Sequence, residues 1–261
     1  MKAYIINLPH AHKHRMHMEQ TLNNFKINYE FIEAIYGKDI DVPNSMYDEK
    51  AYRLLHGKLT NKSEIGCYFS HIKALETFIR SEHSHALIFE DDLILDKSFD
   101  EILLKAMNYS EQFDILRLSS LHNGYPVKLT NILNNFNLCH YLCYCGGAGA
   151  YLLNRKAAKI LIEKIIPMYL PFDHAFDREW LLNLRIMYIH PSPIKQNIFE
   201  NSQIKATSEY KLKRLNRIST LLFRAYNELS RVLFRLKQLF IYKLIFNKIN
   251  KSGFKINTKN T

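Results

Sequence analysis

Short apolar segments alternate with segments of helical periodicity along most of the chain, and this alternation restricts the possible folds more than any other feature. Apolar runs typical of buried strands occupy residues 3–8, 29–34, 85–89 and 113–118. Helices are predicted for residues 12–24, 63–80, 99–108, 155–165 and 176–184. This order predicts an α/β layer fold with a mostly parallel central sheet. In such sheets ligands bind beyond the carboxyl ends of the strands.

Three segments between these elements are candidates for the walls of a site. The polar, irregular residues 38–60 and 119–138 are predicted to be loops, and we expect them to set substrate specificity. The small residues 146–149 lead into a further strand. Glycine backbone lets a ligand approach closely, so this run is a candidate contact, and an ordinary tight turn is the alternative.

Three adjacent carboxylates, Glu90, Asp91 and Asp92, follow the apolar strand at residues 85–89. Like charges repel one another, and partial burial adds to the cost of ionising them. A hard divalent cation such as Mn²⁺ or Mg²⁺ takes oxygen ligands and can bridge to phosphates, so it would stabilise the cluster. The alternative is an acidic corner that water alone screens. The pattern therefore indicates a candidate metal site at the end of a strand.

The net charge of +11 is concentrated at one end of the chain. Residues 205–261 contain 14 Lys or Arg and only two acidic residues, whereas residues 1–204 contain 22 Lys or Arg and 23 acidic residues. We therefore divide the chain into a nearly neutral catalytic domain, residues 1–205, and a basic tail, residues 206–261.

Within the tail, residues 209–250 are predicted to form one or two basic amphipathic helices. The apolar residues that recur at steps of three or four are Leu212, Leu215, Ile218, Leu222, Ala225, Leu229, Leu233, Leu236, Phe240 and Leu244. Two interpretations stay open. The tail packs on the domain as a helical subdomain, or it binds an anionic membrane, to which each Lys or Arg contributes about 1 kcal/mol.

The spacing of the cysteines and the hydropathy of the chain indicate where in the cell the protein is located. The four cysteines have neither zinc-finger spacing nor the number expected of a disulfide framework. The apolar start of the chain is too short for a signal peptide, and no apolar window is long enough to span a bilayer. We expect a cytoplasmic protein, bound peripherally to the cytoplasmic face of the inner membrane.

Several motifs resemble those of glycosyltransferase family 25, the bacterial lipopolysaccharide and lipooligosaccharide transferases. The resemblance covers about residues 1–205, and its most specific part combines Glu64-Ile65-Gly66-Cys67-Tyr68-Phe69-Ser70-His71 with Phe89-Glu90-Asp91-Asp92. It continues in Ile6-Asn7-Leu8 with Arg15, in Gly147-Ala148-Gly149-Ala150-Tyr151-Leu152, and in Phe172-Asp173-His174. It implies a nucleotide-binding fold of the GT-A type and an inverting, metal-assisted transfer of a hexose. The implied donor is a UDP-sugar, commonly UDP-galactose, and the acceptor is a lipid-linked oligosaccharide.

The resemblance also suggests roles for single residues. Glu90, Asp91 and Asp92 would hold the metal on the donor diphosphate, and Asp173 would take the acceptor proton, with Asp177 as the alternative base. Helix capping is a competing role for Asp173. The candidate donor-binding residues are Asn7, Arg15, Ser70, His71 and Arg117. A structural role competes with this function for His71, and simple surface exposure competes with it for Arg15.

Two other functions stay open at this point. A nucleic-acid-binding protein could use the basic tail, but no recognition motif accompanies it and the charge lies at one end, so no nucleic acid is expected. Another metal-dependent nucleotide enzyme, a nucleotidyltransferase or phosphohydrolase, would release pyrophosphate or phosphate in place of UDP.

Overall fold

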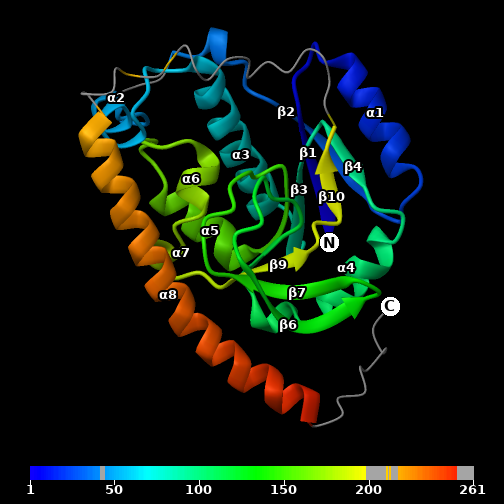
Figure 1. The fold of residues 1–261 in the computed structure, drawn as a ribbon. Coiled ribbons are helices and arrows are strands. Elements are labelled where there is room, and N and C mark those ends of the chain that lie inside the picture. The colour runs from blue at the N-terminus through cyan, green and yellow to red at the C-terminus, as the bar shows by residue number, and fades with distance from the viewer. Residues whose placement is uncertain (42–44, 198–209, 211, 213–216, 252–261) are drawn as a thin grey trace.

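The computed structural model describes residues 1–41, 45–197, 210, 212 and 217–251, and an eight-stranded sheet lies at its centre (Figure 1). The strands are β1 (Lys2–Asn7), β2 (Tyr29–Glu33), β3 (His85–Glu90), β4 (Leu93–Leu95), β5 (Ile115–Arg117), β6 (Pro126–Leu133), β7 (Phe136–Tyr141), β8 (Ala150–Asn154), β9 (Ile186–His190) and β10 (Ile194–Gln196). The large sheet has the order β2-β1-β3-β8-β5-β9-β7-β6, and β4 pairs with β10 in a small second sheet.

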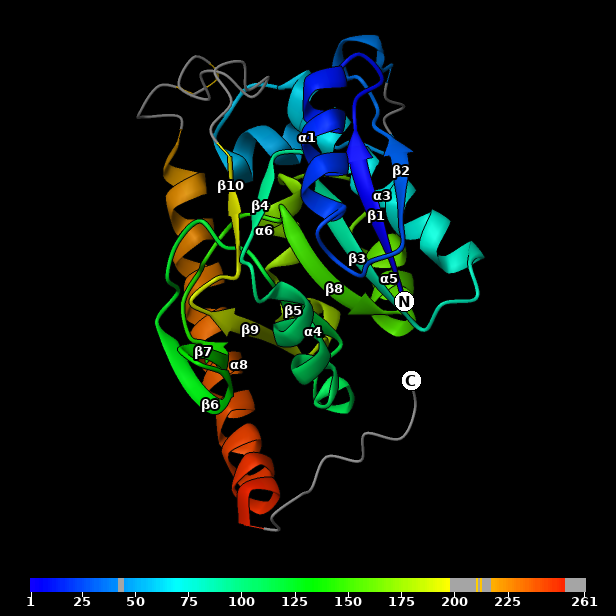
Figure 2. The same cartoon turned by 90° about the vertical axis from the view of Figure 1, so that its right-hand side faces the viewer.

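Helices cover both faces of the large sheet, and one long helix runs along its side (Figure 2). The helices are α1 (His12–Leu22), α2 (Glu49–Ala51), α3 (Lys62–Arg80), α4 (Phe99–Met107), α5 (Arg155–Lys164), α6 (Phe172–Phe176), α7 (Glu179–Leu182) and α8 (Ile218–Lys251). Short helical turns add η1 (Gly37–Asp39), η2 (Tyr52–His56) and η3 (Ser110–Gln112). The predicted α/β fold and the predicted C-terminal helix are therefore confirmed.

Six of the eight strands in the large sheet run in one direction, so the prediction of a mostly parallel sheet is confirmed. The exceptions are β7 and β8, which pair antiparallel with both of their neighbours. Strand β8 lies between β3 and β5, so its amino end meets the carboxyl ends of those two strands. Residues that precede β8 therefore reach the same edge of the sheet as residues that follow β3.

Two local predictions were wrong. Residues 126–141 form the hairpin of β6 and β7, although residues 119–138 were predicted to be a loop. Register shifts interrupt this hairpin, so its apolar residues do not alternate regularly and the strand pattern is hidden. The helix predicted for residues 176–184 is divided into α6 and α7, and the break falls at Asp177 and Arg178.

Each face of the sheet packs against its own hydrophobic cluster. Along β1, Tyr4 and Ile6 face the cluster beneath α3 and α5, whereas Ala3 and Ile5 face the cluster beneath α1 and α4. This alternation follows from the two-residue period of a strand. Because both faces are covered, only the edges and strand ends of the sheet are accessible to ligands.

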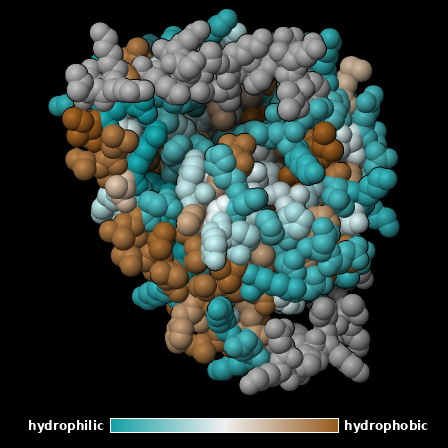
Figure 3. All heavy atoms as spheres, in the orientation of Figure 1, coloured by the Kyte–Doolittle hydropathy of each residue, from teal (hydrophilic) through white to brown (hydrophobic). Residues whose placement is uncertain are grey.

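The side of helix α8 that packs against the domain is polar around Arg231 and Arg235 and apolar from Leu239 onward. Arg235 and Arg231 are buried among the described residues of the domain, as are Tyr242 and Phe246 further along the helix. The predicted apolar stripe faces outward instead, with Leu222 at 69% and Phe240 at 67% exposure. Apolar side chains gather over α8 at the left side of the molecule in Figure 3. The predicted helical segment 209–250 is described only in part. Outside the described residues lie 209, 211 and 213–216, which include Leu215.

Among the helices that the structure describes, none combines the length and the hydropathy that crossing a membrane requires.

Candidate active site

The three carboxylates lie at the carboxyl end of β3, where β1 and β8 also meet. Strands β1 and β3 are parallel, with Ile6 opposite Glu90, so Asn7 at the end of β1 lies beside the acidic cluster. On the other side, the backbone N–H of Glu90 donates to the carbonyl of Gly149, 2.8 Å away, just before β8 begins. The cluster therefore occupies the strand end at which ligands are expected in sheets of this class.

Asp91 is held by hydrogen bonds to both of its carboxylate oxygens. Asn7 Nδ2 donates to Asp91 Oδ2 at 2.7 Å, and His14 Nδ1 lies 3.0 Å from Asp91 Oδ1. These contacts come from the end of β1 and from α1, and they turn the carboxylate toward that side of the site. Asn7 is buried, so it acts here as a fixed hydrogen-bond donor.

Glu90 is oriented from two sides. Gln196 Nε2, on β10, donates to Glu90 Oε2 at 3.1 Å. His71 Nε2, on α3, lies 3.5 Å from Glu90 Oε1, and its Nδ1 lies 3.1 Å from the Tyr151 hydroxyl. The His71 ring also stacks on Phe172 with centroids 4.1 Å apart. His71 is buried, so its contacts fit a residue that orients Glu90.

Asp92 has the most perturbed carboxyl group of the three. Burial, followed by repulsion from Glu90 and Asp91, raises the pKa of Asp92 to about 7. Its Oδ1 is buried and has no hydrogen-bond partner in the part of the chain that the structure describes. An uncompensated buried oxygen next to two further carboxylates fits a hard divalent cation, because a cation would satisfy the oxygen and relieve the repulsion.

Asp173, in the first turn of α6, contacts the same segment before β8 as the acidic cluster does. Its Oδ2 accepts hydrogen bonds from the Tyr144 hydroxyl at 3.0 Å and from the backbone N–H of Gly147 at 3.2 Å. Burial, then the charges of Glu90 and Asp173, raise the pKa of the Cys67 thiol, so both carboxylates lie near this cysteine. Pro171 is the N-cap of α6, so the capping role considered for Asp173 is wrong.

Asp177 lies in a buried ion-pair network. It is fully buried, and its carboxylate lies 2.9 Å from Arg235, 3.6 Å from Arg117 and 3.8 Å from Arg231. Burial opposes its ionisation, but attraction to Arg235, Arg117 and Arg231 outweighs that effect and lowers the pKa of Asp177. A buried carboxylate paired in this way has no path to an acceptor hydroxyl, so the geometry favours Asp173 over Asp177 as a base.

The remaining predicted donor-binding residues have protein partners. Arg117 is buried and donates to the carbonyl of Gly146 at 2.8 Å and also to the carbonyl of Gly147. Ser70 is buried and donates to the carbonyl of Gly66 at 2.7 Å. Arg15 is exposed, pairs with Glu19 at 3.0 Å and lies over the ring of Phe31. Asn7 and His71 thus contact the acidic cluster, and Asp173 contacts the segment before β8, as Arg117 does. Among the described residues, Arg117, Ser70 and Arg15 make no ion pair with Glu90, Asp91 or Asp92.

Sequence reasoning missed three side chains that orient the carboxylates: His14, Gln196 and Tyr144. His14 lies beside Arg15 in a helix that also contains His12 and His17, and this histidine-rich pattern is a signal that could have been used. Gln196 reaches Glu90 through the pairing of β10 with β4, for which the local sequence gives no signal. Tyr144 directly precedes Cys145 and the small residues 146–149, which were considered only for their backbone.

A second, mixed ligand set shares Glu90. The ligand atoms of Cys67, His71 and Glu90 lie within 4.8 Å of one another. A thiol suits softer metals than Mg²⁺ or Mn²⁺, and the raised pKa of Cys67 keeps it protonated. Glu90, Asp91 and Asp92 offer the oxygen ligands that a hard cation prefers, but among the described residues their ligand atoms do not converge within that distance.

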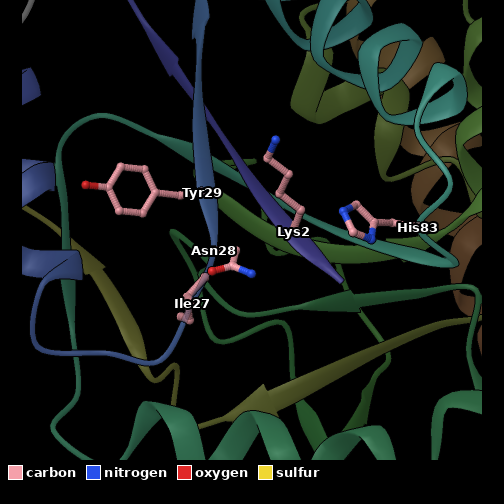
Figure 4. A pocket seen from close by; sticks show the side chains of 5 residues that line it. All are labelled: Lys2, Ile27, Asn28, Tyr29 and His83. Carbon is pink, nitrogen blue, oxygen red and sulfur yellow. The ribbon is translucent and has the colours of Figure 1, made fainter.

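An open hollow of about 490 Å³ lies away from this site (Figure 4). It is lined by Lys2, Ile27, Asn28, Tyr29 and His83. Lys2 begins β1 and Asn7 ends it, so the hollow lies about 16 Å along the strand from the carboxylates. It contains no cluster of carboxylates, so we assign it no part in the chemistry.

Comparison with known proteins gives a consistent result. The family model described as glycosyltransferase family 25 (LPS biosynthesis protein) matches residues 1–176. The lipooligosaccharide biosynthesis protein lic2B of Haemophilus influenzae is 27% identical over 62% of this chain and 62% of its own length. The procollagen galactosyltransferase 1-A of Xenopus laevis is 25% identical over 66% of this chain, which spans only 30% of that protein. The lacto-N-neotetraose biosynthesis glycosyltransferase LgtE of Neisseria meningitidis is 24% identical over 76% of this chain and 75% of its own length.

Among solved structures, the galactosyltransferase LgtC in complex with donor and acceptor sugar analogues aligns with a TM-score of 0.40 and 10% identity. That alignment covers 86% of this chain and 96% of the other.

Proposed function

Because this chain belongs to glycosyltransferase family 25, we propose that it transfers a hexose from a UDP-sugar to a lipopolysaccharide or lipooligosaccharide acceptor. UDP-galactose is the proposed donor, and a galactosyltransferase among the relatives supports it. A lipooligosaccharide biosynthesis protein among the relatives supports the proposed acceptor. The observation that carries the proposal is geometric: an acidic cluster with an uncompensated buried oxygen and a separate carboxylate, Asp173, both contact the short segment 147–149 that leads into β8.

Asp92, assisted by Glu90 and Asp91, is proposed to hold a divalent cation, Mn²⁺ or Mg²⁺. When bound, the cation would neutralise the negative charge that develops on the departing diphosphate. The hydrogen bonds from Asn7 and Gln196 fix the directions of Asp91 and Glu90, so these two carboxylates are already oriented. At the β1 side, Asn7 and the exposed Arg15 are the proposed contacts of the nucleotide, and Arg15 suits a phosphate through its planar fork.

Asp173 is proposed as the general base. In an inverting transfer, the acceptor oxygen forms a bond to the anomeric carbon while the bond from that carbon to the UDP oxygen breaks. The hydroxyl proton then passes to a carboxylate on the acceptor side. The Oδ2 atom of Asp173 accepts hydrogen bonds from Tyr144 and Gly147, which fix the direction of this carboxylate and support its role as the base.

A donor panel tests the activity. The protein is incubated with Mn²⁺ and separate nucleotide sugars, and UDP release and the glycosylated product are measured. We expect UDP release to depend on the sugar and on Mn²⁺, and to be lost in Asp92→Ala. The control is Glu101→Gln, an exposed acidic residue of α4 paired with Lys105. Release of pyrophosphate or phosphate in place of UDP would favour the nucleotidyltransferase or phosphohydrolase alternative.

We also propose that α8 binds an anionic membrane, on the cytoplasmic face of the inner membrane, where a lipid-linked acceptor would lie. Its outward face presents Leu229 at 62%, Leu233 at 61% and Phe240 at 67% exposure. Lys237, Lys243 and Lys248 are exposed basic residues along that part of α8. The only acidic residue of α8, Glu228, is paired with Arg231. Exposed apolar side chains interspersed with cations match an interfacial helix.

Vesicle sedimentation tests this attachment. We expect the wild type to sediment with phosphatidylglycerol vesicles more than with phosphatidylcholine vesicles, and the triple variant Leu229→Ser, Leu233→Ser, Phe240→Ser to stay in the supernatant. A triple variant that sediments like the wild type would reject the proposal. If the same variant instead converts a dimer to a monomer, a second copy of the chain covers this face.

A further inference from the structure

The segment between β7 and β8, residues 142–149, is held in place by side chains of α8. Arg235 donates to the carbonyl of Cys143 at 2.6 Å, and the backbone N–H of Tyr144 donates to Glu228 Oε1 at 3.3 Å. The guanidinium of Arg231 lies over the ring of Tyr144, 5.1 Å from its centroid. Three side chains of the C-terminal helix thus contact two consecutive residues of one loop.

The same loop also contacts the proposed base, Asp173. The Tyr144 hydroxyl and the Gly147 N–H both donate to Asp173 Oδ2. Gly146 and Gly147 have φ values of +63° and +72°, a conformation that glycine adopts without strain. Burial and the charge of Asp173 raise the pKa of Tyr144 far above its ordinary value, so its hydroxyl stays protonated and remains a donor.

A buried charge network anchors this arrangement. Arg235 contacts Asp177 at 2.9 Å and is also paired with Glu179, while Arg117 reaches from Asp177 to the carbonyls of Gly146 and Gly147. Buried ion pairs of this kind tolerate little displacement, because a partner that moves away leaves an unpaired charge in the low-dielectric interior of the protein. The network therefore fixes α8 relative to the loop.

We infer that Tyr144 is a positioning residue for Asp173, and that α8 holds Tyr144 in place through Glu228, Arg231 and Arg235. The inference rests on the proposed function, because it gives Asp173 the role of base. Tyr144 directs one oxygen of Asp173 toward itself, which leaves the other oxygen to accept the proton of the acceptor. The C-terminal helix thereby supports the loop that positions the proposed base.

The test is Tyr144→Phe in the full chain, which removes the hydroxyl and keeps the ring. We expect kcat for sugar transfer to fall about 10- to 100-fold while the KM for the donor stays within about twofold, since positioning affects the chemical step more than donor binding. Glu228→Gln, altered on the α8 side, should lower kcat about threefold in the same pattern. Tyr226→Phe, at an exposed position of α8, is the matched control and should match the wild type.

The outcomes separate this inference from the proposed function. Wild-type protein that releases no UDP would reject both, and full activity in Asp173→Asn would also reject both the base and its positioning. Loss of activity in Asp173→Asn together with a wild-type kcat in Tyr144→Phe would reject the positioning role alone. A Tyr144→Phe variant that raises the donor KM and leaves kcat unchanged would place Tyr144 at the donor, which also contradicts the inference.

Discussion

Two groups of carboxylates in this protein have opposite electrostatic surroundings. Asp177 is surrounded by Arg117, Arg231 and Arg235, and its pKa is lowered. Asp92 lies beside two more carboxylates, and its pKa is raised to about 7. Within the described residues, no Lys or Arg forms an ion pair with Glu90, Asp91 or Asp92. The fold itself supplies the counter-charges of the first group, whereas the second group has no Lys or Arg partner among the described residues and can be neutralised by protons or by a bound cation.

The same substitution at both sites therefore has opposite effects on stability. Asp177→Asn leaves three buried guanidiniums short of one counter-charge and should lower the free energy of unfolding by about 3 to 5 kcal/mol. Metal-free Asp92→Asn at pH 8 removes a repelling charge and should raise it, on the order of 1 to 3 kcal/mol. Urea unfolding measures both. If both variants changed the free energy of unfolding in the same direction, the electrostatic distinction between the two groups would be wrong.

The effect of Asp92→Asn on activity should be opposite to its effect on stability. Asp92→Asn should lower UDP release about 100- to 1000-fold, because the ligand that neutralises the departing diphosphate is weakened. Initial rates at saturating Mn²⁺ measure the effect, with Glu101→Gln as the control. A variant that gains stability and keeps its activity would show that the cluster is only an acidic corner.

The pH dependence of cation binding sharpens the contrast. The Asp92 carboxyl holds its proton below a pH of about 7, and a cation must displace that proton. The apparent affinity for Mn²⁺ should fall about tenfold for each pH unit below 7 and level off above it. The folded-state pKa is raised above the unfolded value, so the metal-free protein should also lose stability as the pH rises from about 4 toward 7. Calorimetric titration between pH 5.5 and about 8.5 measures the affinity, and a flat profile would contradict the assignment.

The smallest expected effect concerns the residues that orient the cluster. Gln196→Ala removes one hydrogen bond to Glu90 and should weaken Mn²⁺ binding about two- to tenfold. Asn131→Ala, in the β6–β7 hairpin, removes comparable hydrogen bonds away from the site and should leave the affinity unchanged. Equal losses in both variants would point to a general effect on stability.

Local pattern was enough to predict the elements that carry the acidic cluster. Residues 85–89 form a continuous apolar run that ends at Glu90, and such a run specifies a buried strand without knowledge of its neighbours. The likeness of Asp173 to a family motif also pointed to a residue that the structure brings to the same strand end as the cluster. Both features are short-range in sequence.

The features that were missed depend on partners far away in the chain. The periodicity of residues 218–244 identifies an apolar side of α8, but it does not say which side meets the domain. That choice depends on Asp177 and Glu179, which supply counter-charges for Arg235 from more than 50 positions away. Arg117 was likewise interpreted as a phosphate ligand because its pairing with Asp177 is invisible in the local sequence.

The outward leucines and inward arginines of α8 have a consequence for evolution within the family. An acid at position 177 and a cation at position 235 depend on each other, although the family match ends at residue 176. A lineage that loses or replaces its C-terminal helix leaves Asp177 with Arg117 as its counter-charge and removes Arg231 and Arg235, so a change at 177 is expected to accompany that loss. Correlated substitution across these positions would therefore trace which relatives share this architecture.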